Sequence, residues 1–362
     1  MDDGSKGTPR MTVGVDLGDR YSYLCFLDTE SGEVIEEGRL RTTPEALKRR
    51  FFSERHQPLR VAIEAGTHSP WVSRLLEECG HEVLVANPRK LRLIYASKRK
   101  TDELDAESLA RLARLDPKLL HPLNHRGEDS QAHLAIIRSR QALIATRTQL
   151  IDHVRGAVKS FGARLPKCVA RSFHRKAPEH LPEELVVALG PILETIGSLT
   201  ERIRDYERQL EIIPREHYPQ AELLRQVEGV GPLTALTFVV LSLEDPSRFA
   251  KSRSVGAYLG LVPASDRSGD RDPQRRISKE GDEMLRKLLL GSAQYILGPF
   301  AKEDSDLRCH GEKIASRGGK NAKKRAAVAV ARKLSVLLHR LWVTGEVYEP
   351  LYNAHRRGEL AA

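Results

Sequence analysis

The sequence is poor in cysteine, and the spacing of its few cysteines excludes the common structural zinc sites. The four cysteines, Cys25, Cys79, Cys168 and Cys309, lie far apart and include no Cys-x-x-Cys pair. No run of histidines completes a zinc quartet around them. We therefore expect reduced, structural thiols.

Long apolar runs are also missing. The chain has no apolar stretch near the roughly 18 residues that indicate a membrane-spanning helix, and it does not open with a charged and then apolar leader. Neither secretion nor membrane insertion is indicated. We expect a cytoplasmic, nucleoid-associated protein with no membrane partner.

Acidic residues are too few to balance the basic ones. Lys plus Arg number 59 and Asp plus Glu 49, for a formal net charge of +10. This excess favours a polyanionic partner such as nucleic acid over an acidic metabolite. Solubility alone is the competing explanation, because net charge is an unspecific cue.

Turn residues and apolar periodicity divide the chain of 362 residues into five segments. Residues 1–10 are polar and are predicted to be a disordered leader. Residues 11–125 are predicted to form three short strands followed by alternating helix and strand, which indicates a mixed α/β sheet. Residues 126–216 repeat apolar pairs every seven positions and then show coiled-coil spacing, which predicts a helical hairpin or a dimerising arm. Residues 217–345 are mostly helical and basic, and residues 346–362 form a tail. The predicted fold class is α/β plus α.

Within the first domain, strands are expected at residues 11–16, 21–27, 34–40, 59–64 and 82–85, and helices at 44–52, 70–78 and after an N-capping Thr101.

Two acidic residues end apolar strands. Asp16 follows Val13-Gly-Val15, and Glu64 follows Val61-Ala-Ile63. A carboxylate at the end of a buried strand needs a compensating charge, which a divalent cation supplies.

Asp102 and Asp105 are three residues apart, so both lie on one face of the expected helix. Together with the two strand-end acids they can hold two Mg²⁺ ions roughly 3.5 to 4 Å apart, an arrangement that promotes phosphoryl transfer. Each acid alone also has a plainer explanation as a turn residue, an exposed strand end or a first-turn acid favoured by the helix dipole.

These acids carry a resemblance to a known family. The segments are Val-Gly-Val-Asp16-Leu-Gly, Ala-Ile-Glu64-Ala-Gly and Lys-Thr-Asp102-Glu-Leu-Asp105-Ala. In order and spacing they are similar to the RuvC-like DEDD domain, an RNase-H-like fold, of insertion-sequence transposases related to the Piv DNA invertases. The resemblance implies that all four acids are catalytic metal ligands.

The C-terminal part resembles the second domain of the same transposases, through Tyr258-Leu-Gly-Leu-Val-Pro263, Asp266-Arg-Ser268-Gly269 and Ile277-Ser278-Lys279-Glu-Gly281. The resemblance implies a serine nucleophile that becomes linked to DNA. Ser268 is favoured because it lies in a loop before Gly269, whereas Ser278 is interpreted as the N-cap of a helix. A serine needs a base or a metal to accept its proton, and we hypothesise that the metals of the N-terminal domain activate it.

Basic residues and one glycine turn are the candidate nucleic-acid contacts. The segment from Val227 to Ala235 has the form of a helix-hairpin-helix turn, in which glycines let backbone N–H groups approach a phosphate. A helix is expected over residues 320–333, where it would follow a nucleic-acid backbone. The candidate contacts are Gly229, Gly231, Arg267, Arg271, Arg275, Arg276, Lys279, Lys320, Lys323 and Lys324.

The resemblance also implies partners that residue spacing does not reveal. Members of such families use a structured guide RNA encoded by the mobile element, and their dimers pair into a tetramer. The expected activity is Mg²⁺-dependent DNA strand cleavage and exchange. Two alternatives stay open: a Holliday-junction endonuclease of RuvC type that uses water as nucleophile, and a non-catalytic DNA-binding protein in which the acids are structural.

Overall fold

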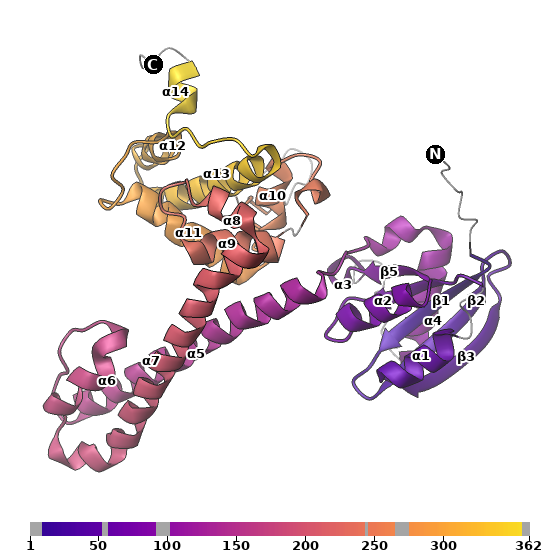
Figure 1. The fold of residues 1–362 in the computed structure, drawn as a ribbon, viewed down its shortest axis with the longest axis horizontal. Coiled ribbons are helices and arrows are strands. Elements are labelled where there is room, and N and C mark those ends of the chain that lie inside the picture. Colours follow the sequence, from indigo (N-terminus) through magenta and orange to yellow (C-terminus); the bar gives the residue numbers. More distant parts are fainter. Residues whose placement is uncertain (1–8, 53–56, 92–101, 243–244, 265–274, 357–362) are drawn as a thin grey trace. The chain divides into compact units, whose positions relative to one another are not determined.

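A five-stranded mixed sheet forms the core of the N-terminal part in the computed structural model (Figure 1), which describes residues 9–52, 57–91, 102–242, 245–264 and 275–356. The strands are β1 (Met11–Leu17), β2 (Tyr21–Asp28), β3 (Val34–Arg41), β4 (Arg60–Glu64) and β5 (Glu82–Ala86). Their order is β3-β2-β1-β4-β5, which is RNase-H-like. The first three are antiparallel neighbours, and β4 is parallel to both β1 and β5.

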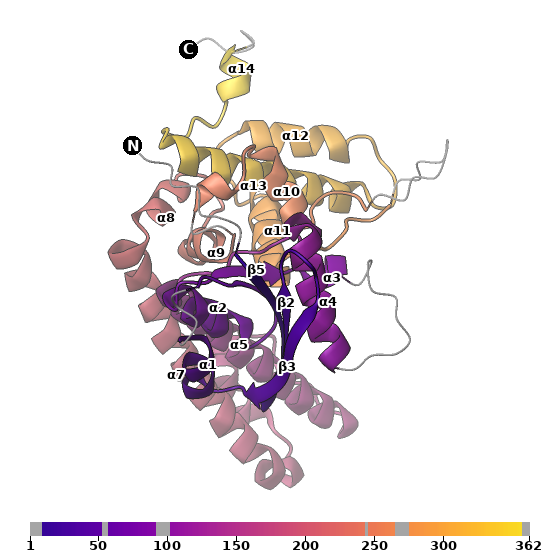
Figure 2. The same cartoon turned by 90° about the vertical axis from the view of Figure 1, so that its right-hand side faces the viewer.

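Helices cover both faces of this sheet because its central strands carry small or apolar residues on both sides. Val13 and Val15 of β1 lie in one core with α1 (Pro44–Phe52) and α2 (Ser69–Glu78). On the other face, α4 (Asp102–Leu115) packs its alanines against the sheet. Figure 2 shows α1 and α2 on one side of the strands and α4 on the other. A short helix, α3 (Pro88–Leu91), follows β5.

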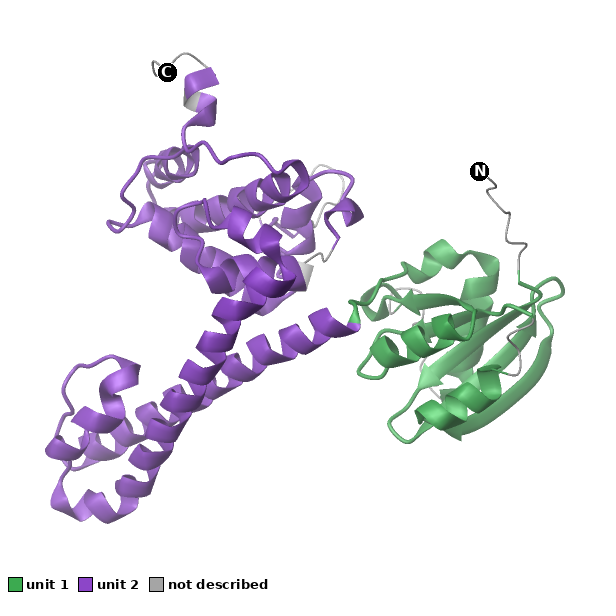
Figure 3. Cartoon of the chain, in the orientation of Figure 1, with its two compact units in different colours: residues 1–127 green, residues 128–362 purple. Residues whose placement is uncertain are grey.

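The remaining residues form a second unit, which is helical. Contacts divide the chain into residues 1–127 and residues 128–362 (Figure 3). Two long helices, α5 (Glu128–Ser160) and α7 (Glu183–His217), form a hairpin, with α6 (Phe173–Lys176) between them in sequence. The further helices are α8 (Pro219–Leu224), α9 (Pro232–Ser242), α10 (Arg253–Tyr258), α11 (Glu283–Leu297), α12 (Asp306–Ala315), α13 (Ala322–Thr344) and α14 (Tyr352–Arg356). Single 3-10 turns lie at Pro117–Leu120, Ala170–Ser172, Pro178–His180 and Pro246–Arg248.

The hairpin buries the coiled-coil stripe that the sequence predicts. Leu189, Ile196 and Ile203 of α7 are each at most 2% exposed, and Leu189 and Ile196 share a core with Val154 and Val158 of α5. At these residues the stripe is therefore covered by α5 of the same chain.

The predicted fold class is confirmed, and each expected strand and helix of the first domain matches an observed one within about two residues. Of the predictions for residues 1–125, the N-cap Thr101 and most of the disordered leader fall outside the described residues.

Candidate active site

Asp16 and Glu64 lie at the same end of the sheet. Strands β1 and β4 are parallel, with Val15 paired to Ile63, so the residue after each of these two is a carboxylate. The carboxyl ends of parallel neighbours lie side by side. Asp16 is half-buried and Glu64 is exposed, which leaves both carboxylates accessible at that end.

Helix α4 runs antiparallel to β1 and brings its first turn to the same end. Its C-terminal Arg114 donates to the carbonyl of Thr29 at 2.9 Å, and the amide of Thr29 donates to the carbonyl of Arg10, just before β1. Further along, a Cβ placed on Gly14 would lie 1.9 Å from the Ala106 carbonyl oxygen. Gly14 is therefore the point where strand and helix backbones meet.

From the contact between Gly14 and Ala106, the distance along β1 to Asp16 is similar to the distance along α4 to Asp102. Asp16 is two residues beyond Gly14, about 7 Å along a strand. Asp102 is four residues before Ala106, about 6 Å along a helix. Asp105, which precedes Ala106, is half-buried, and Asp102 is exposed. The fold thus brings all four predicted acids to one end of the first unit.

A divalent cation fits this donor set in chemistry. Carboxylate oxygens are the ligands that Mg²⁺ prefers. Strands β1 and β4 and the first turn of α4 place these carboxylates at the same end of the sheet. Within the described residues, however, no three Asp, Glu, His or Cys side chains are gathered closely enough to enclose an ion. The backbone therefore sets the location of the site, while the side chains do not form a closed cage.

In the second unit, a short backbone ladder holds the two ends of the connection that contains Ser268. The Ala264 amide donates to the Arg276 carbonyl at 2.9 Å, and the Ser278 amide donates to the Val262 carbonyl at 2.9 Å. Pro263 and Ile277 form an antiparallel bridge. Ser268 itself, with Arg267 and Arg271, lies outside the described residues.

Close backbone contact at the ladder explains two glycines that flank the connection. A Cβ on Gly260 would lie 2.3 Å from the Glu280 amide nitrogen, and a Cβ on Gly281 would lie 2.2 Å from the Tyr258 carbonyl oxygen. Both glycines also have positive φ, a conformation that other residues rarely adopt.

Arg286 of α11 stabilises the same ladder by hydrogen bonds to backbone carbonyls. Its side chain is 7% exposed, and its Nη1 donates to the carbonyls of Glu280 at 2.6 Å, Gly281 at 3.0 Å and Leu259 at 3.3 Å. Buried carbonyls need donors, and one guanidinium serves all three. Sequence analysis assigned Arg286 no role, although the segment Leu285-Arg286 is similar to the second domain of the same transposases.

The interpretation of Ser278 as a helix N-cap is wrong. Helix α11 begins at Glu283, and its N-cap is Asp282, whose carboxylate accepts from the Leu285 amide at 2.9 Å. Ser278 instead lies on the ladder, where its hydroxyl accepts from the Glu280 amide at 3.4 Å. Helix capping therefore gives no reason to set Ser278 aside, and Ser278 is a candidate nucleophile beside Ser268.

The glycine turn between α8 and α9 has a packing explanation at one of its two positions. Gly229 has φ of +85°, and a Cβ there would lie 3.1 Å from the Ser292 carbonyl oxygen of α11. For Gly231, a Cβ would meet nothing within 4 Å. A phosphate-binding role remains a prediction for both glycines.

The predicted basic contacts that the structure describes separate into two groups. A groove of the second unit is lined by Arg275, Arg276, Lys279 and Lys324, together with cations that sequence reasoning missed, such as Arg253 and Arg317. Lys320 and Lys323 are exposed and are not among the lining residues. The expectation that the helix starts at Lys320 is wrong, because Gly318 and Gly319 adopt positive φ and α13 begins at Ala322.

No helix in the part of the chain that the structure describes is both long and apolar enough to cross a membrane.

Comparison with protein families matches both units. A profile of DEDD transposases of the IS110 type, described as "Transposase", matches residues 13–162. A second profile, described as "Transposase IS116/IS110/IS902 family", matches residues 221–304. The first match includes all four acids, and the second includes Ser268, Ser278 and the ladder.

Individual relatives align over most of the chain. The transposase for insertion sequence element IS1111A of Coxiella burnetii is 29% identical over 349 residues, covering 93% of this chain and 90% of the relative. A probable family 20 transposase of Pseudomonas aeruginosa is 28% identical, covering 93% and 98%. The transposase for insertion sequence element IS1328 of Yersinia enterocolitica is 29% identical, covering 80% and 85%.

Proposed function

The chain belongs to the IS110/IS116/IS902 family of transposases, DNA phosphoryl-transfer enzymes whose DEDD domain implies a divalent metal, and on this basis we propose its reaction and its site residues. It moves an insertion sequence by Mg²⁺-dependent cleavage and exchange of DNA strands, with a transient serine–DNA linkage. The observation that carries the proposal is the delivery of four carboxylates to one end of the sheet by β1, β4 and α4.

The metal ligands are Asp16, Glu64, Asp102 and Asp105, and together they bind two Mg²⁺ ions. When bound, such ions neutralise the charge that develops on the attacking and leaving oxygens of a phosphodiester. Asp16 and Glu64 extend from rigid neighbouring strands, and the two aspartates extend from the first turn of α4. The ligand positions therefore depend on the packing of α4 at Gly14.

The nucleophile is the Ser268 hydroxyl, with Ser278 as the second candidate. Its oxygen forms a bond to phosphorus while the bridging P–O bond of the DNA strand breaks. The hydroxyl proton passes to the departing DNA oxygen, either directly or through solvent. In the second step a DNA hydroxyl attacks the phosphoserine, the Oγ–P bond breaks, and the serine recovers its proton.

The partners are the DNA of the element ends and target and an element-encoded guide RNA, and the active form is a homodimer that pairs into a tetramer. Support for a nucleic-acid partner comes from the net positive charge. Support for guide RNA and for the tetramer is the family resemblance alone.

A denaturing gel tests the proposal. The wild-type protein is incubated with element-end DNA, cognate RNA and Mg²⁺, beside Ser268→Ala, Ser278→Ala and Asp16→Ala. We expect a covalent protein–DNA adduct that disappears in Ser268→Ala and Asp16→Ala and persists in Ser278→Ala. Loss of the adduct in Ser278→Ala but not in Ser268→Ala would transfer the nucleophile to Ser278. Cleavage without any adduct in the wild type would refute the serine linkage and identify a nuclease that uses water.

A further inference from the structure

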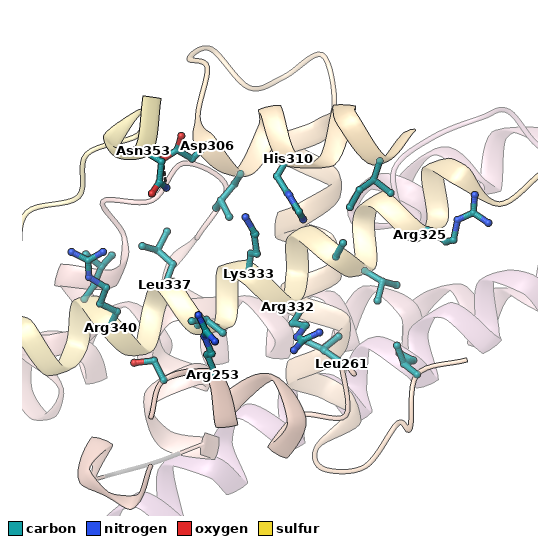
Figure 4. Close-up of a pocket in the computed structure, with 18 of the residues that line it drawn as sticks. Arg253, Leu261, Asp306, His310, Arg325, Arg332, Lys333, Leu337, Arg340 and Asn353 are labelled. Atoms are coloured by element: carbon teal, nitrogen blue, oxygen red, sulfur yellow. Dashed lines mark hydrogen bonds between the residues drawn. The ribbon is translucent and has the colours of Figure 1, made fainter. Parts of the chain in front are cut away.

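A large groove crosses the second unit beside the ladder. It has a volume of about 2190 Å³ and is lined by residues of α10, α12 and α13, together with Arg276 and Lys279 of the ladder. Figure 4 shows Arg253 of α10 and Arg332 and Lys333 of α13 among the lining side chains.

The groove concentrates positive charge. Eleven lysine and arginine residues line it, against three carboxylates. The resulting excess of eight positive charges compares with a net charge of +10 for the whole chain. Like charges held together raise each other's energy unless an anion neutralises them, so a surface of this kind favours a polyanion.

Many of these cations are not neutralised by the protein. Across the described residues, no side-chain hydrogen bond or ion pair is found for six exposed groove cations, Arg253, Arg276, Lys279, Lys324, Arg332 and Lys333. By contrast, the exposed Lys287 of α11 pairs with Glu283 at 2.8 Å. The six groove cations are therefore available to phosphate oxygens.

Helix α13 arranges its cations as a track. Arg325, Arg332 and Arg340 all line the groove and follow one another at intervals of seven and eight residues. These intervals are close to two helical turns, so the three arginines share one face of the helix and span about 22 Å along it. One strand of B-form DNA places roughly six phosphates in that length.

Apolar surface lies between these cations. Val328 and Val336 of α13 are half-buried and also line the groove. Their methyl groups can contact the sugars and bases of a strand whose phosphates meet the arginines. The alternation of cations and apolar side chains therefore suits a nucleic-acid strand better than a small anion.

We propose that this groove binds the sugar–phosphate backbone of a nucleic-acid strand and leads it to the ladder. The proposal rests on the proposed function for the identity of the reaction, but the binding it describes requires no metal and no chemistry. DNA and guide RNA share the phosphodiester chemistry that the groove recognises, and the experiment separates them.

The acidic start of the C-terminal tail limits the track at its far end. Glu346 pairs with Arg340 at 2.7 Å, and Glu349 also lines the groove. A phosphate that reached the last cation of the track would have to compete with Glu346 for it. Neutralising Glu346 should therefore lengthen the track.

Fluorescence anisotropy with the full-length chain tests the groove. The probes are fluorescein-labelled oligonucleotides of one sequence, as single-stranded DNA, duplex DNA and single-stranded RNA, titrated in EDTA over a range of KCl concentrations. The groove variant is Arg332→Gln with Lys333→Gln. Its control is Arg175→Gln with Lys176→Gln, which removes a likewise exposed, adjacent Arg–Lys pair from α6 and changes the net charge equally.

We expect the groove variant to bind roughly tenfold more weakly at 0.1 M salt, and its salt slope to fall by about two counterions. The control pair should keep the wild-type affinity and slope, and Glu346→Gln should bind more tightly. The probe whose affinity falls most, DNA or RNA, identifies the strand in the groove. Equal losses in both double variants, or no loss in the groove variant, would overturn the proposal. Since the assay contains no Mg²⁺, failure of the serine reaction would leave its outcome unchanged.

Discussion

Replacement of Gly14 by alanine is the sharpest test of how the acidic site is built. The added Cβ would lie 1.9 Å from the Ala106 carbonyl oxygen and 2.6 Å from the Ala110 amide nitrogen. Both neighbours are backbone atoms, so no side chain can rotate out of the way. The first distance must grow to about 3.4 Å, an ordinary contact, which moves α4 away from β1 by roughly 1.5 Å.

That movement should affect stability and activity separately. Overpacking of this kind costs about 1–3 kcal/mol, which corresponds to a melting temperature lowered by roughly 3–15 °C for a unit of this size. A displacement near 1 Å in catalytic groups can cost on the order of 100-fold in rate. Because Asp102 and Asp105 move with α4 while Asp16 and Glu64 remain on the sheet, we expect strand exchange to fall by about that factor.

The assay compares Gly14→Ala with Gly38→Ala, below the melting temperature of both. Gly38 is an exposed position of β3, and a Cβ there meets nothing within 4 Å. Strand exchange, melting temperature and DNA binding are measured for each variant. Wild-type exchange with an unchanged melting temperature in Gly14→Ala would refute the inference that α4 positions the acids through this contact.

Three further predictions concern the second unit and the histidines. Asp282→Ala removes the N-cap of α11 and should lower the free energy of unfolding by about 1 kcal/mol, whereas Asp282→Ser should restore most of it in a urea titration. Arg286→Met leaves the three ladder carbonyls without their charged donor and should cost about 2–4 kcal/mol and reduce adduct formation; full activity at wild-type stability would show that the ladder does not need this residue. Burial lowers the pKa of four histidines below 6.5, so the folded state favours their neutral form. Their contribution to the stability of the fold should be complete above pH 6.5 and should decline as the pH falls below it. A melting temperature that increases as the pH is lowered from 6.5 to 5.5 would contradict this prediction. The histidines are His125, His133, His174 and His310.

The fold of the first unit was predictable because its cues are local. Alternating apolar residues in β1 and the turn around Ser31-Gly32 indicate strands and their ends without tertiary information. Asp16 and Glu64 could be linked in advance because both end buried strands, and the observed β1–β4 pairing places them side by side.

Features that depend on distant contacts could not be predicted in the same way. Nothing near Gly14 in the sequence indicates that Ala106 will lie against it. Ser278 and Asp282 are both favourable N-cap residues. The sequence does not reveal that the backbone approaches closely at Gly260 and Gly281, so that Ser278 lies in the ladder and α11 begins only at Glu283. The sequence indicated only some of the groove cations. The groove also needs α10, which is remote in sequence from α12 and α13.

The ladder also makes the serine-bearing connection replaceable as a module. Its two ends are joined by the Ala264–Arg276 and Ser278–Val262 hydrogen bonds, so the sequence between them need not supply that closure. Grafting the corresponding connection of a relative onto this chain should therefore exchange the proposed nucleophile and its neighbours while the host unit keeps its melting temperature. In this arrangement a different sequence can occupy the connection while the residues that close it, 262–264 and 276–278, stay the same.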